Sequence, residues 1–518
     1  MQGFTVGDQP GDKISLVWIS SLPPTWRISC SRQHLNCSWL VWTLVFVVCG
    51  HVVGCGAGAS TRYARVEASL LAGDPQQADT IIAEAEAAYG ARDRLLYLMD
   101  RGMTLHLAGQ YAKSNAMLEE ADRVVEQLFT RRLHRQVAAL LVNDTLVPFR
   151  GDPYEKIMIS VIKALNYALL QEWDDALVEA RRIDHRLNVL ADSVAESSYH
   201  EDPFARYLTG LLYEAAGDRM NAFVAYRKAY EAYRWAHQWS TLTVPALLKR
   251  DLLRLAKALQ MDQEYTLYRE AFPDLEPSSS RASYSDGPYG RIVMLSYHGQ
   301  APHFEDRWVD IPISLEALTL VLQTKRLLGD STFSTREIES VLYGLQGRVV
   351  RVALPHLVPH KSRVAFGTLR VQGETVAIQT QTIRVYDVTA IAKKNFNDKF
   401  PKLLVRAAAR AAVKMASAEG LGIGVSAGID DKAAQAIVRV VATALARIFA
   451  LQSEEADKRS WRTLPDEIHL ARVEVPPGTY RVTFQAMNQD GRPLGRLLTY
   501  RVTLAPGETR FMIARIMF

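Results

Sequence analysis

Two histidines in "PHLVPHK" have a spacing that could support metal chemistry. His356 and His360 are four residues apart, which would place both imidazoles on one face of a helix, where they could share a zinc ion. Pro355 and Pro359 argue against that helix, because proline lacks the backbone N–H that a helix interior uses. We therefore expect histidines in a loop, with a zinc site as the less favoured alternative.

A second candidate for metal binding is "SYHGQAPHFED", in which two histidines lie near two carboxylates. His298, His303, Glu305 and Asp306 offer the nitrogen and oxygen ligands that hard or borderline metals take, but ordinary loop histidines are again the default interpretation. The chain contains no HExxH or P-loop sequence. We therefore predict no catalytic site, no cofactor and no bound metal, while a hydrolase without a known motif stays open.

All four cysteines lie near the N-terminus: Cys30, Cys37, Cys49 and Cys55. Because no thiol follows Cys55, the rest of the chain cannot form a disulfide, a Cys-ligated zinc site or an iron–sulfur cluster. A cysteine nucleophile is excluded there for the same reason. Any sulfur chemistry of this protein is therefore confined to its N-terminal segment.

Cys55 follows an apolar run that ends in "VVGCGAGAS". No Asp, Glu, Lys or Arg occurs between Arg32 and Arg62, and an apolar run with a basic flank before it and small residues after it is typical of a secretory signal. The order "VVGC" resembles the bacterial lipobox, which implies diacylation of the Cys55 thiol and cleavage just before it. By the same resemblance, Gly56 in place of Asp favours the outer membrane.

The alternative for this segment is an uncleaved transmembrane helix, since about 20 apolar residues span a bilayer. Thr43, His51 and the Gly-rich end argue against it. Residues 1–54 are longer than the ~15–30 residues of an ordinary signal peptide. We interpret them as a signal peptide with a mis-assigned N-terminal extension, and residues 55–62 as a lipidated tether. Both alternatives place the body of the protein outside the cytoplasm.

Residues 63–271 are rich in Ala, Leu, Glu and Arg, which predicts helices. Three stretches repeat small and large residues at offsets typical of tetratricopeptide (TPR) hairpins, and a weaker copy precedes them. Small residues let two antiparallel helices approach closely, and large residues fill the gaps beside them. The key positions are Gly102, Gly109, Tyr111, Ser114, Leu118 and Ala121 in the first copy, Ala164, Tyr167, Trp173, Ala176, Ala180 and Ile183 in the second, and Gly210, Tyr213, Gly217, Ala222, Tyr226 and Ala229 in the third.

The intervals between the corresponding positions Gly73, Gly109, Gln171 and Gly217 are unequal, whereas a regular TPR array repeats every ~34 residues. We therefore predict a degenerate array with inserts over residues 63–271. The alternative is a generic helical bundle. The Pro-, Ser- and Gly-rich residues 272–290 that follow predict a linker.

Beyond the linker the chain becomes rich in strand-forming residues. "RIVMLSYHG" and "TVAIQTQTIRVYDV" predict strands, and "DKFPKLLVRAAARAAVKMASA" predicts a helix with Pro401 near its start. We assign residues 291–470 to a mixed α/β domain. The alternating residues 471–518, with turns at "PG" and "DG", predict a small β-sandwich-like module, and "PPGTYRVTF" resembles modules of the PEGA type. The predicted fold class is therefore α+β, with a TPR-like helical array first.

Several blocks together resemble a family of uncharacterised bacterial outer-membrane lipoproteins with TPR-like repeats and a β-rich C-terminal half. The blocks are "LVNDTLVPFRGDPYEKIMISVIKALNYALLQEWDDALVEARRID", "RVYDVTAIAKKNFNDKFPKLLVRAAARAAVK" and "ADKRSWRTLPDEIHLARVEVPPGTY". The resemblance covers residues 61–480, although Lys458 stands where a Thr is expected. Because the family has no established activity, the resemblance implies placement and architecture, not a mechanism.

The candidates for contact with a partner come from these blocks and from a polar cluster expected on the helix that carries Glu179. The alternative for that cluster is ordinary helix ion pairs worth about 0.2–0.5 kcal/mol each. The candidate residues are Asn143, Tyr154, Glu155, Asn166, Tyr167, Glu179, Arg181, Trp461 and Arg472.

The net charge of +5 is spread thinly along the chain, so we expect no nucleic-acid partner. The sequence predicts a lipid-anchored protein of the cell envelope that acts as a protein-binding scaffold or accessory factor through its repeats. Its expected partners are other envelope proteins or lipoproteins, and its expected location is the periplasmic side of the outer membrane, or else the inner membrane by an uncleaved helix. The alternatives are a subunit of an export or pore complex and a periplasmic hydrolase of an envelope polymer.

Overall fold

A computed structural model describes residues 55–135, 147–192, 199, 201–273, 275, 289–314, 319, 347, 349–426 and 456–518. One compact unit spans Arg62–Phe518. The predicted signal peptide, Asn143 and most of the predicted linker lie outside the described residues, and Cys55 begins the first described helix. No helix in this described part has both the length and the apolar character needed to cross a membrane.

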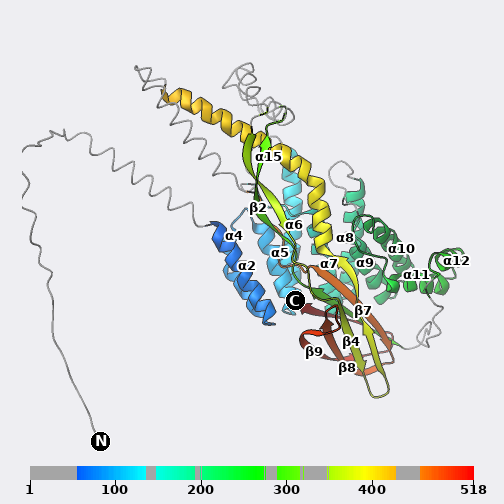
Figure 1. Cartoon of the computed structure of the whole chain (residues 1–518). Coiled ribbons are helices and arrows are strands. Elements are labelled where there is room, and N and C mark those ends of the chain that lie inside the picture. The colour runs from blue at the N-terminus through cyan, green and yellow to red at the C-terminus, as the bar shows by residue number, and fades with distance from the viewer. Residues whose placement is uncertain are drawn as a thin grey trace, which may run out of the picture. The chain divides into compact units, whose positions relative to one another are not determined.

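The N-terminal half consists of helices that pack as successive antiparallel hairpins, drawn in blue to green in Figure 1. The tight turns within the hairpins have a residue of positive φ at Gly73, Gly109, Gln171, Gly217 and Gln260. A residue in the left-handed conformation ends a helix because it turns the chain back, so that the backbone N–H groups that follow bond the carbonyls of the last helical turn. The helices are α2 (Cys55–Leu71), α3 (Pro75–Glu84), α4 (Glu86–Tyr89), α5 (Arg94–Leu107), α6 (Tyr111–Arg135), α7 (Pro153–Leu170), α8 (Trp173–Asp192), α9 (Pro203–Ala215), α10 (Arg219–Ala236), α11 (Ala246–Ala258) and α12 (Asp262–Ala271).

The two helices of a hairpin approach closely where the predicted small residues lie. A Cβ atom on Gly210 of α9 would stand 2.3 Å from the ring of Tyr226 on α10, and one on Gly102 of α5 would stand 2.4 Å from Leu118 on α6. Real Cβ atoms essentially never come so close, so a side chain at either crossing would force the neighbouring residue to move. This packing confirms the TPR-like helical array, which was predicted from the same positions.

The C-terminal half contains an inner sheet and an outer sheet. The inner sheet has the order β10-β1-β7-β6, with β1 and β10 parallel and its other pairs antiparallel. The outer sheet has the order β5-β4-β8-β9 and is antiparallel throughout. The strands are β1 (Gly290–His298), β4 (Phe366–Gln372), β5 (Ala377–Gln381), β6 (Ile383–Asp387), β7 (Glu467–Val475), β8 (Gly478–Met487), β9 (Pro493–Leu504) and β10 (Thr509–Ile516).

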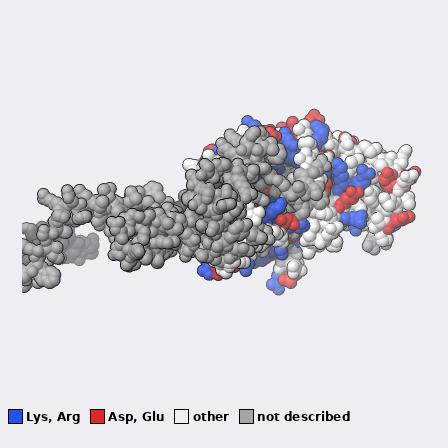
Figure 2. All heavy atoms as spheres, turned by 90° about the horizontal axis from the view of Figure 1, so that it is seen from above, with Lys and Arg blue, Asp and Glu red and all other residues white. Residues whose placement is uncertain are grey.

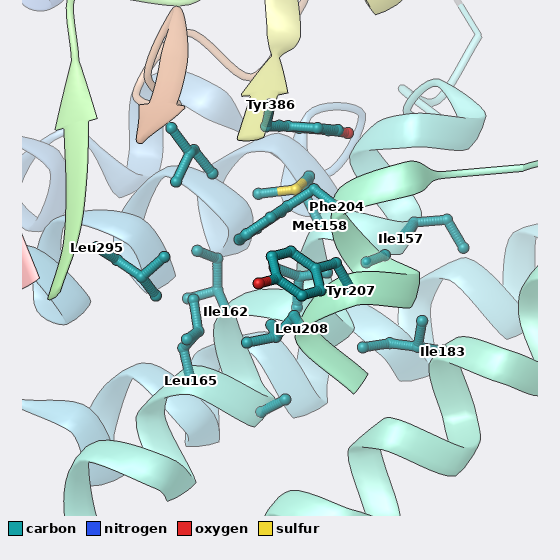
Figure 3. Close-up of a cluster of buried hydrophobic side chains, with 14 of the residues drawn as sticks. Ile157, Met158, Ile162, Leu165, Ile183, Phe204, Tyr207, Leu208, Leu295 and Tyr386 are labelled. Carbon is teal, nitrogen blue, oxygen red and sulfur yellow. The ribbon is translucent and has the colours of Figure 1, made fainter. Parts of the chain in front are cut away.

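Both faces of the inner sheet are buried, as strand β1 illustrates. Ile292 and Met294 belong to the core between the two sheets, whereas Val293 and Leu295 belong to the core that the inner sheet shares with the helices. Because successive side chains of a strand point to opposite faces, burial on both faces explains the continuous apolar run that the sequence shows there. Figure 3 shows Leu295 in the core that the helices share.

A two-stranded ribbon, β2 (His303–Pro312) and β3 (Val349–Val358), packs on the long helix α15 (Val388–Ser426), drawn in yellow in Figure 1. This helix corrects one expectation. Pro401 lies inside α15 and not near its start, because the helix begins directly after β6, where the backbone N–H of Ala390 donates to the Asp387 carboxylate at 2.8 Å. The cap at Asp387 falls within the stretch that the sequence predicts as strand.

The C-terminal residues 471–518 are shared between the two sheets. Strands β7 and β10 belong to the inner sheet, and β8 and β9 belong to the outer sheet. The strands β1, β4, β5 and β6, which precede this stretch by many residues, complete both sheets. The predicted boundary at residue 471 therefore falls within β7, and the sandwich is assembled from segments far apart in the sequence.

Candidate functional site

The first helices of the hairpins are covered by the inner sheet on the side away from their partner helices. From Pro203 to Leu212 every residue of α9 is buried, and α7 is buried almost throughout. Phe204 of α9 packs on Tyr386 of β6 with ring centroids 5.3 Å apart, and both are labelled in Figure 3. The chain itself thus occupies the inner face of its helical array.

Glu155 lies at this interface, in the first turn of α7. Its Oε2 atom accepts a hydrogen bond from the backbone N–H of Asp152 at 2.6 Å, which closes a capping box, and its Oε1 atom accepts one from the backbone N–H of Trp461 at 2.7 Å. Burial raises the pKa of the Glu155 carboxyl to about 8, against the opposing effect of these two N–H donors. Trp461, buried beside it, is among the largest fully enclosed side chains.

Asn166 belongs to a polar chain that crosses α5, α6 and α7 and ends on β1. Its amide oxygen accepts from Nδ1 of His106 at 2.5 Å, and Nε2 of His106 accepts from the Tyr297 hydroxyl at 3.1 Å. The Asn166 amide in turn donates to Ser114 and Asn115. Burial lowers the pKa of His106 to about 4, so the imidazole is neutral and can both donate and accept.

Arg472 of β7 reaches into the helices and forms two hydrogen bonds with the Asp251 carboxylate on α11, at 2.5 and 2.9 Å. The Tyr207 hydroxyl donates to the same carboxylate at 3.1 Å. Nearby, burial would raise the pKa of Glu214, but Arg291, Arg254 and Arg472 hold it at about 2. A bidentate arginine–carboxylate pair of this kind fixes orientation as well as charge.

Glu179 of α8 belongs to a buried ion cluster with Lys163 of α7. The Lys163 ammonium lies 2.9 Å from Glu179 and 3.1 Å from Asp122, and also contacts Glu119. Arg182 contacts the same three carboxylates, and Arg186 pairs with Asp122. The alternative of ordinary helix ion pairs accounts for the contact of Glu179 with Arg182, three residues later, but Lys163 and Glu179 themselves are buried between α6, α7 and α8.

The structure therefore brings most of the candidate residues into contacts within the chain. The buried residues are Tyr154, Glu155, Asn166, Glu179, Trp461 and, at its guanidinium, Arg472. Glu155, Asn166 and Arg472 take part in contacts that join the two halves, whereas Glu179 joins helices within the first half. Partner binding through the set stays a prediction, and Tyr167 and Arg181 are the described members that reach the surface.

Besides Tyr167 and Arg181, a third residue at the surface of the same helices is Tyr213. Tyr167 on α7 and Tyr213 on α9 are half-buried and occupy equivalent positions, one turn after the small crossing residue of each hairpin. Burial raises the pKa of Tyr213, and Arg181 beside it acts in the opposite direction. We call Tyr167, Arg181 and Tyr213 the Tyr–Arg strip.

The surface around the strip includes exposed apolar side chains. Leu170, one turn after Tyr167, is 39% exposed, and Val178, one turn before Arg181, is 43% exposed.

Figure 2 shows that Lys and Arg mix with Asp and Glu over the described surface on its visible face, so the charge of that face has no single sign.

The predicted metal candidates separate in the structure. His298 is buried at the end of β1, where its ring lies 4.2 Å from that of His469, whereas His303 on β2 pairs with His360 at 2.8 Å and with Glu305 at 3.1 Å. His356 of β3 lies opposite Glu305 in the ribbon. Among the described residues, no group of three or more His, Cys, Asp or Glu side chains has an arrangement suited to a metal ion.

No protein-family model and no curated protein sequence matches the chain. Among solved structures, the chain is similar to BtubC (BKLC) from P. vanneervenii, with 15% identity, a TM-score of 0.30 and coverage of 48% of this chain and 94% of that one. It is also similar to a Podosopora anserina kinesin light chain of nearly identical TPR-like repeats, with 12% identity, a TM-score of 0.28 and coverage of 43% and 97%. At these TM-scores the likeness adds nothing to what the hairpin packing shows.

Sequence reasoning missed the residues that complete the interface, among them His106, Asp251 and Tyr386. Each is a single polar or aromatic residue inside a helical or strand pattern, where it carries no motif. The signal that could have found them is an isolated Asp or His on the apolar face of a helix, because a buried polar group requires a partner. The identity of that partner depends on the tertiary fold.

Proposed function

We propose that this protein is a lipid-anchored protein of the cell envelope that binds a partner protein through the outer surface of its helical array. The observation that supports this most directly is the Tyr–Arg strip, in which a half-exposed tyrosine recurs in successive hairpins and Arg181 lies beside the second of them. Tyrosine and arginine are enriched among the residues that dominate protein interfaces. Stacked helical repeats in general present extended surfaces for such binding.

The inner face of the array is unavailable for this role because the inner sheet covers it. Binding at the strip needs no opening of the fold, since Leu170 and Val178 already offer apolar surface beside it. A lipid anchor at Cys55 would hold the protein in a thin layer next to the membrane and raise its effective concentration toward other envelope proteins.

The anchor is tested by substituting the thiol. We expect Cys55→Ser to abolish incorporation of labelled fatty acid, to leave the precursor uncleaved and to change membrane fractionation, whereas Cys49→Ser should retain the label. If Cys55→Ser is labelled, processed and fractionated like the wild type, lipid attachment at this residue is wrong.

The strip is tested by crosslinking in intact cells, followed by purification of the protein and identification of the adducts. We expect one reproducible protein adduct that Arg181→Ala strongly reduces. Arg250→Ala removes an equally exposed arginine from α11 and should leave the adduct unchanged. The proposal fails if no reproducible protein adduct forms, or if both variants behave like the wild type.

A further inference from the structure

The outer sheet has one face on the core and the other face in solvent. On β8, Val482 and Phe484 point into the core between the sheets, whereas Arg481 between Tyr480 and Val482 is exposed. The same alternation holds on β4, where Leu369 is buried and Arg370 is exposed. Within the part of the chain that the structure describes, the outward side chains of this sheet are therefore left for contact with solvent or a ligand.

The outward positions on this face carry threonine, arginine and glutamine. On the two longest strands they are Thr479, Arg481 and Thr483 of β8, and Thr499, Arg501 and Thr503 of β9. Arg370 and Gln372 continue the pattern on β4, opposite Thr483 and Arg481. None of these strand positions is acidic, so together they carry positive charge.

Arg481 and Arg501 lie directly opposite each other on β8 and β9. Like charges in such a cross-strand pair destabilise a sheet. Within the described residues neither guanidinium has a hydrogen bond or an ion pair, whereas their neighbours are paired, since Arg370 donates to Gln379 at 2.9 Å and Thr479 bonds Thr503 at 2.9 Å. An unneutralised arginine pair at the centre of a polar face indicates a place for an external anion.

A hollow of about 680 Å³ opens over the arginine pair. Volumes of about 300–1,000 Å³ are typical of sites for small molecules or short polymer segments. Glu374 in the turn between β4 and β5 lies at its edge and supplies the hollow's carboxylate. The other residues that the argument uses are Gln372, Thr479, Arg481, Thr499 and Arg501.

The chemistry of this face fits a chain of sugars with carboxylate groups. Paired guanidinium groups bind a carboxylate with two parallel hydrogen bonds, and the hydroxyl and amide side chains of Thr and Gln can exchange hydrogen bonds with sugar hydroxyls. We propose that the solvent face of the outer sheet binds an acidic polysaccharide, with Arg481 and Arg501 holding its carboxylates and Arg370 supporting a neighbouring unit.

Two other anionic partners fit less well. Single-stranded nucleic acid is bound largely by stacking of bases on aromatic side chains, and the outward positions named above are not aromatic. Tyr480 and Tyr500 also line the hollow, but both pack into the core between the sheets, and their hydroxyls donate to the carbonyls of Pro476 and Ile513. A membrane surface requires apolar side chains that enter the lipid, and on β9 the large exposed apolar residue is Leu497 alone.

The test measures binding of the full-length protein in detergent to immobilised polygalacturonate, with neutral dextran as the reference. We expect the affinity to fall as the salt concentration rises, because salt screens charge interactions. We also expect the affinity to fall at least about tenfold in the Arg481→Ala/Arg501→Ala variant, because hydrogen bonds to charged groups contribute more free energy than neutral ones. The Arg250→Ala/Arg492→Ala variant removes the same charge at exposed positions off this face and should bind like the wild type.

A second variant keeps the charge but not the geometry. Arg481→Lys/Arg501→Lys should bind with intermediate affinity, because lysine cannot form the bidentate contact. Circular dichroism and thermal melting establish whether each variant is folded. If the Arg481→Ala/Arg501→Ala variant does not fold, the affinity of the Arg481→Lys/Arg501→Lys variant tests the proposal in its place.

Four outcomes would overturn the proposal. The first two are equal affinity for dextran and polygalacturonate, and no binding to either. The other two are wild-type affinity of the Arg481→Ala/Arg501→Ala variant, and tighter binding of the protein to single-stranded DNA or anionic vesicles. The measurement needs neither a lipid anchor nor a protein partner, so its failure leaves the proposed function untouched.

Discussion

The backbone N–H of Trp461 donates to the buried carboxylate of Glu155, 306 residues earlier in the chain, at 2.7 Å. The other oxygen of the same carboxylate caps α7 through Asp152. One acidic side chain thus caps the start of α7 and holds the segment that leads into β7. Both Glu155 and Trp461 are almost fully buried, so the contact is part of the core that the helices and the inner sheet share.

The pKa of Glu155 leads to a prediction about pH. Its folded-state pKa of about 8 exceeds its ordinary value of about 4.3. Between these values the folded protein binds a proton that the unfolded chain releases, so the stability contributed by this group is present below about pH 4.3 and is lost as pH rises toward 8. Thermal melts from pH 5 to pH 8 should therefore show a falling melting temperature, other groups being equal.

Glu155→Gln should remove that contribution and flatten the pH dependence. The variant should also be less stable by about 1–3 kcal/mol, because its amide nitrogen, unlike a carboxyl oxygen, cannot accept a hydrogen bond from the backbone N–H that it faces. Glu231→Gln on the exposed side of α10 is the matched control and should keep the wild-type slope. A slope unchanged by Glu155→Gln would mean that Glu155 titrates at its ordinary pKa.

Gly210 leads to a prediction about packing. Alanine forms helices better than glycine by about 1 kcal/mol, but a Cβ at this position would overlap the ring of Tyr226. We expect Gly210→Ala to destabilise the protein by about 1–3 kcal/mol, as overpacking does. Gly58→Ala on α2, where a Cβ meets no atom within 4 Å, should be neutral or stabilising in the same chemical denaturation. Equal midpoints for both variants would contradict the close crossing.

Lys163 leads to a prediction about buried charge. Burial alone would lower the pKa of its ammonium, but Asp122 and Glu179 raise it above its ordinary value, so the group is charged. Lys163→Met leaves these carboxylates with Arg182 and Arg186 only, and we expect a loss of about 3–5 kcal/mol in the free energy of unfolding. Adding Glu179→Gln should recover part of that loss in a double-mutant cycle. Additive effects of the two substitutions would show that they do not interact.

The helical turns were predictable because their chemistry is local. The sequence aligned Gly73, Gly109, Gln171 and Gly217 as corresponding positions of the repeats, and all four have positive φ. Gln260 adopts the same conformation at a position that the alignment did not include, and glutamine by itself gives no signal of it. The start of α15 was misplaced for a related reason, since the capping role of Asp387 became visible only in the fold.

The pairing of strands and the burial of the candidate residues were not predictable from the sequence. The parallel pairing of β1 with β10 joins segments about two hundred residues apart, and no local pattern specifies such a register. In the same way, Arg472 looks like an ordinary outward residue of a strand. It faces the helices only because the inner sheet is covered on both sides.

The burial of the inner sheet leads to the last prediction, that the helical array is not independently stable. A fragment of residues 62–275 exposes the face of α7 and α9 that carries Met158, Ile162, Phe204 and Leu208 in Figure 3. Each fully buried side chain of this kind contributes about 1.5–3 kcal/mol, so the fragment should aggregate or melt without cooperativity. Adding a fragment of residues 289–518 should restore a cooperative transition. Cooperative melting of the first fragment alone, at the temperature of the full chain, would show that the sheet is an accessory and not part of its core.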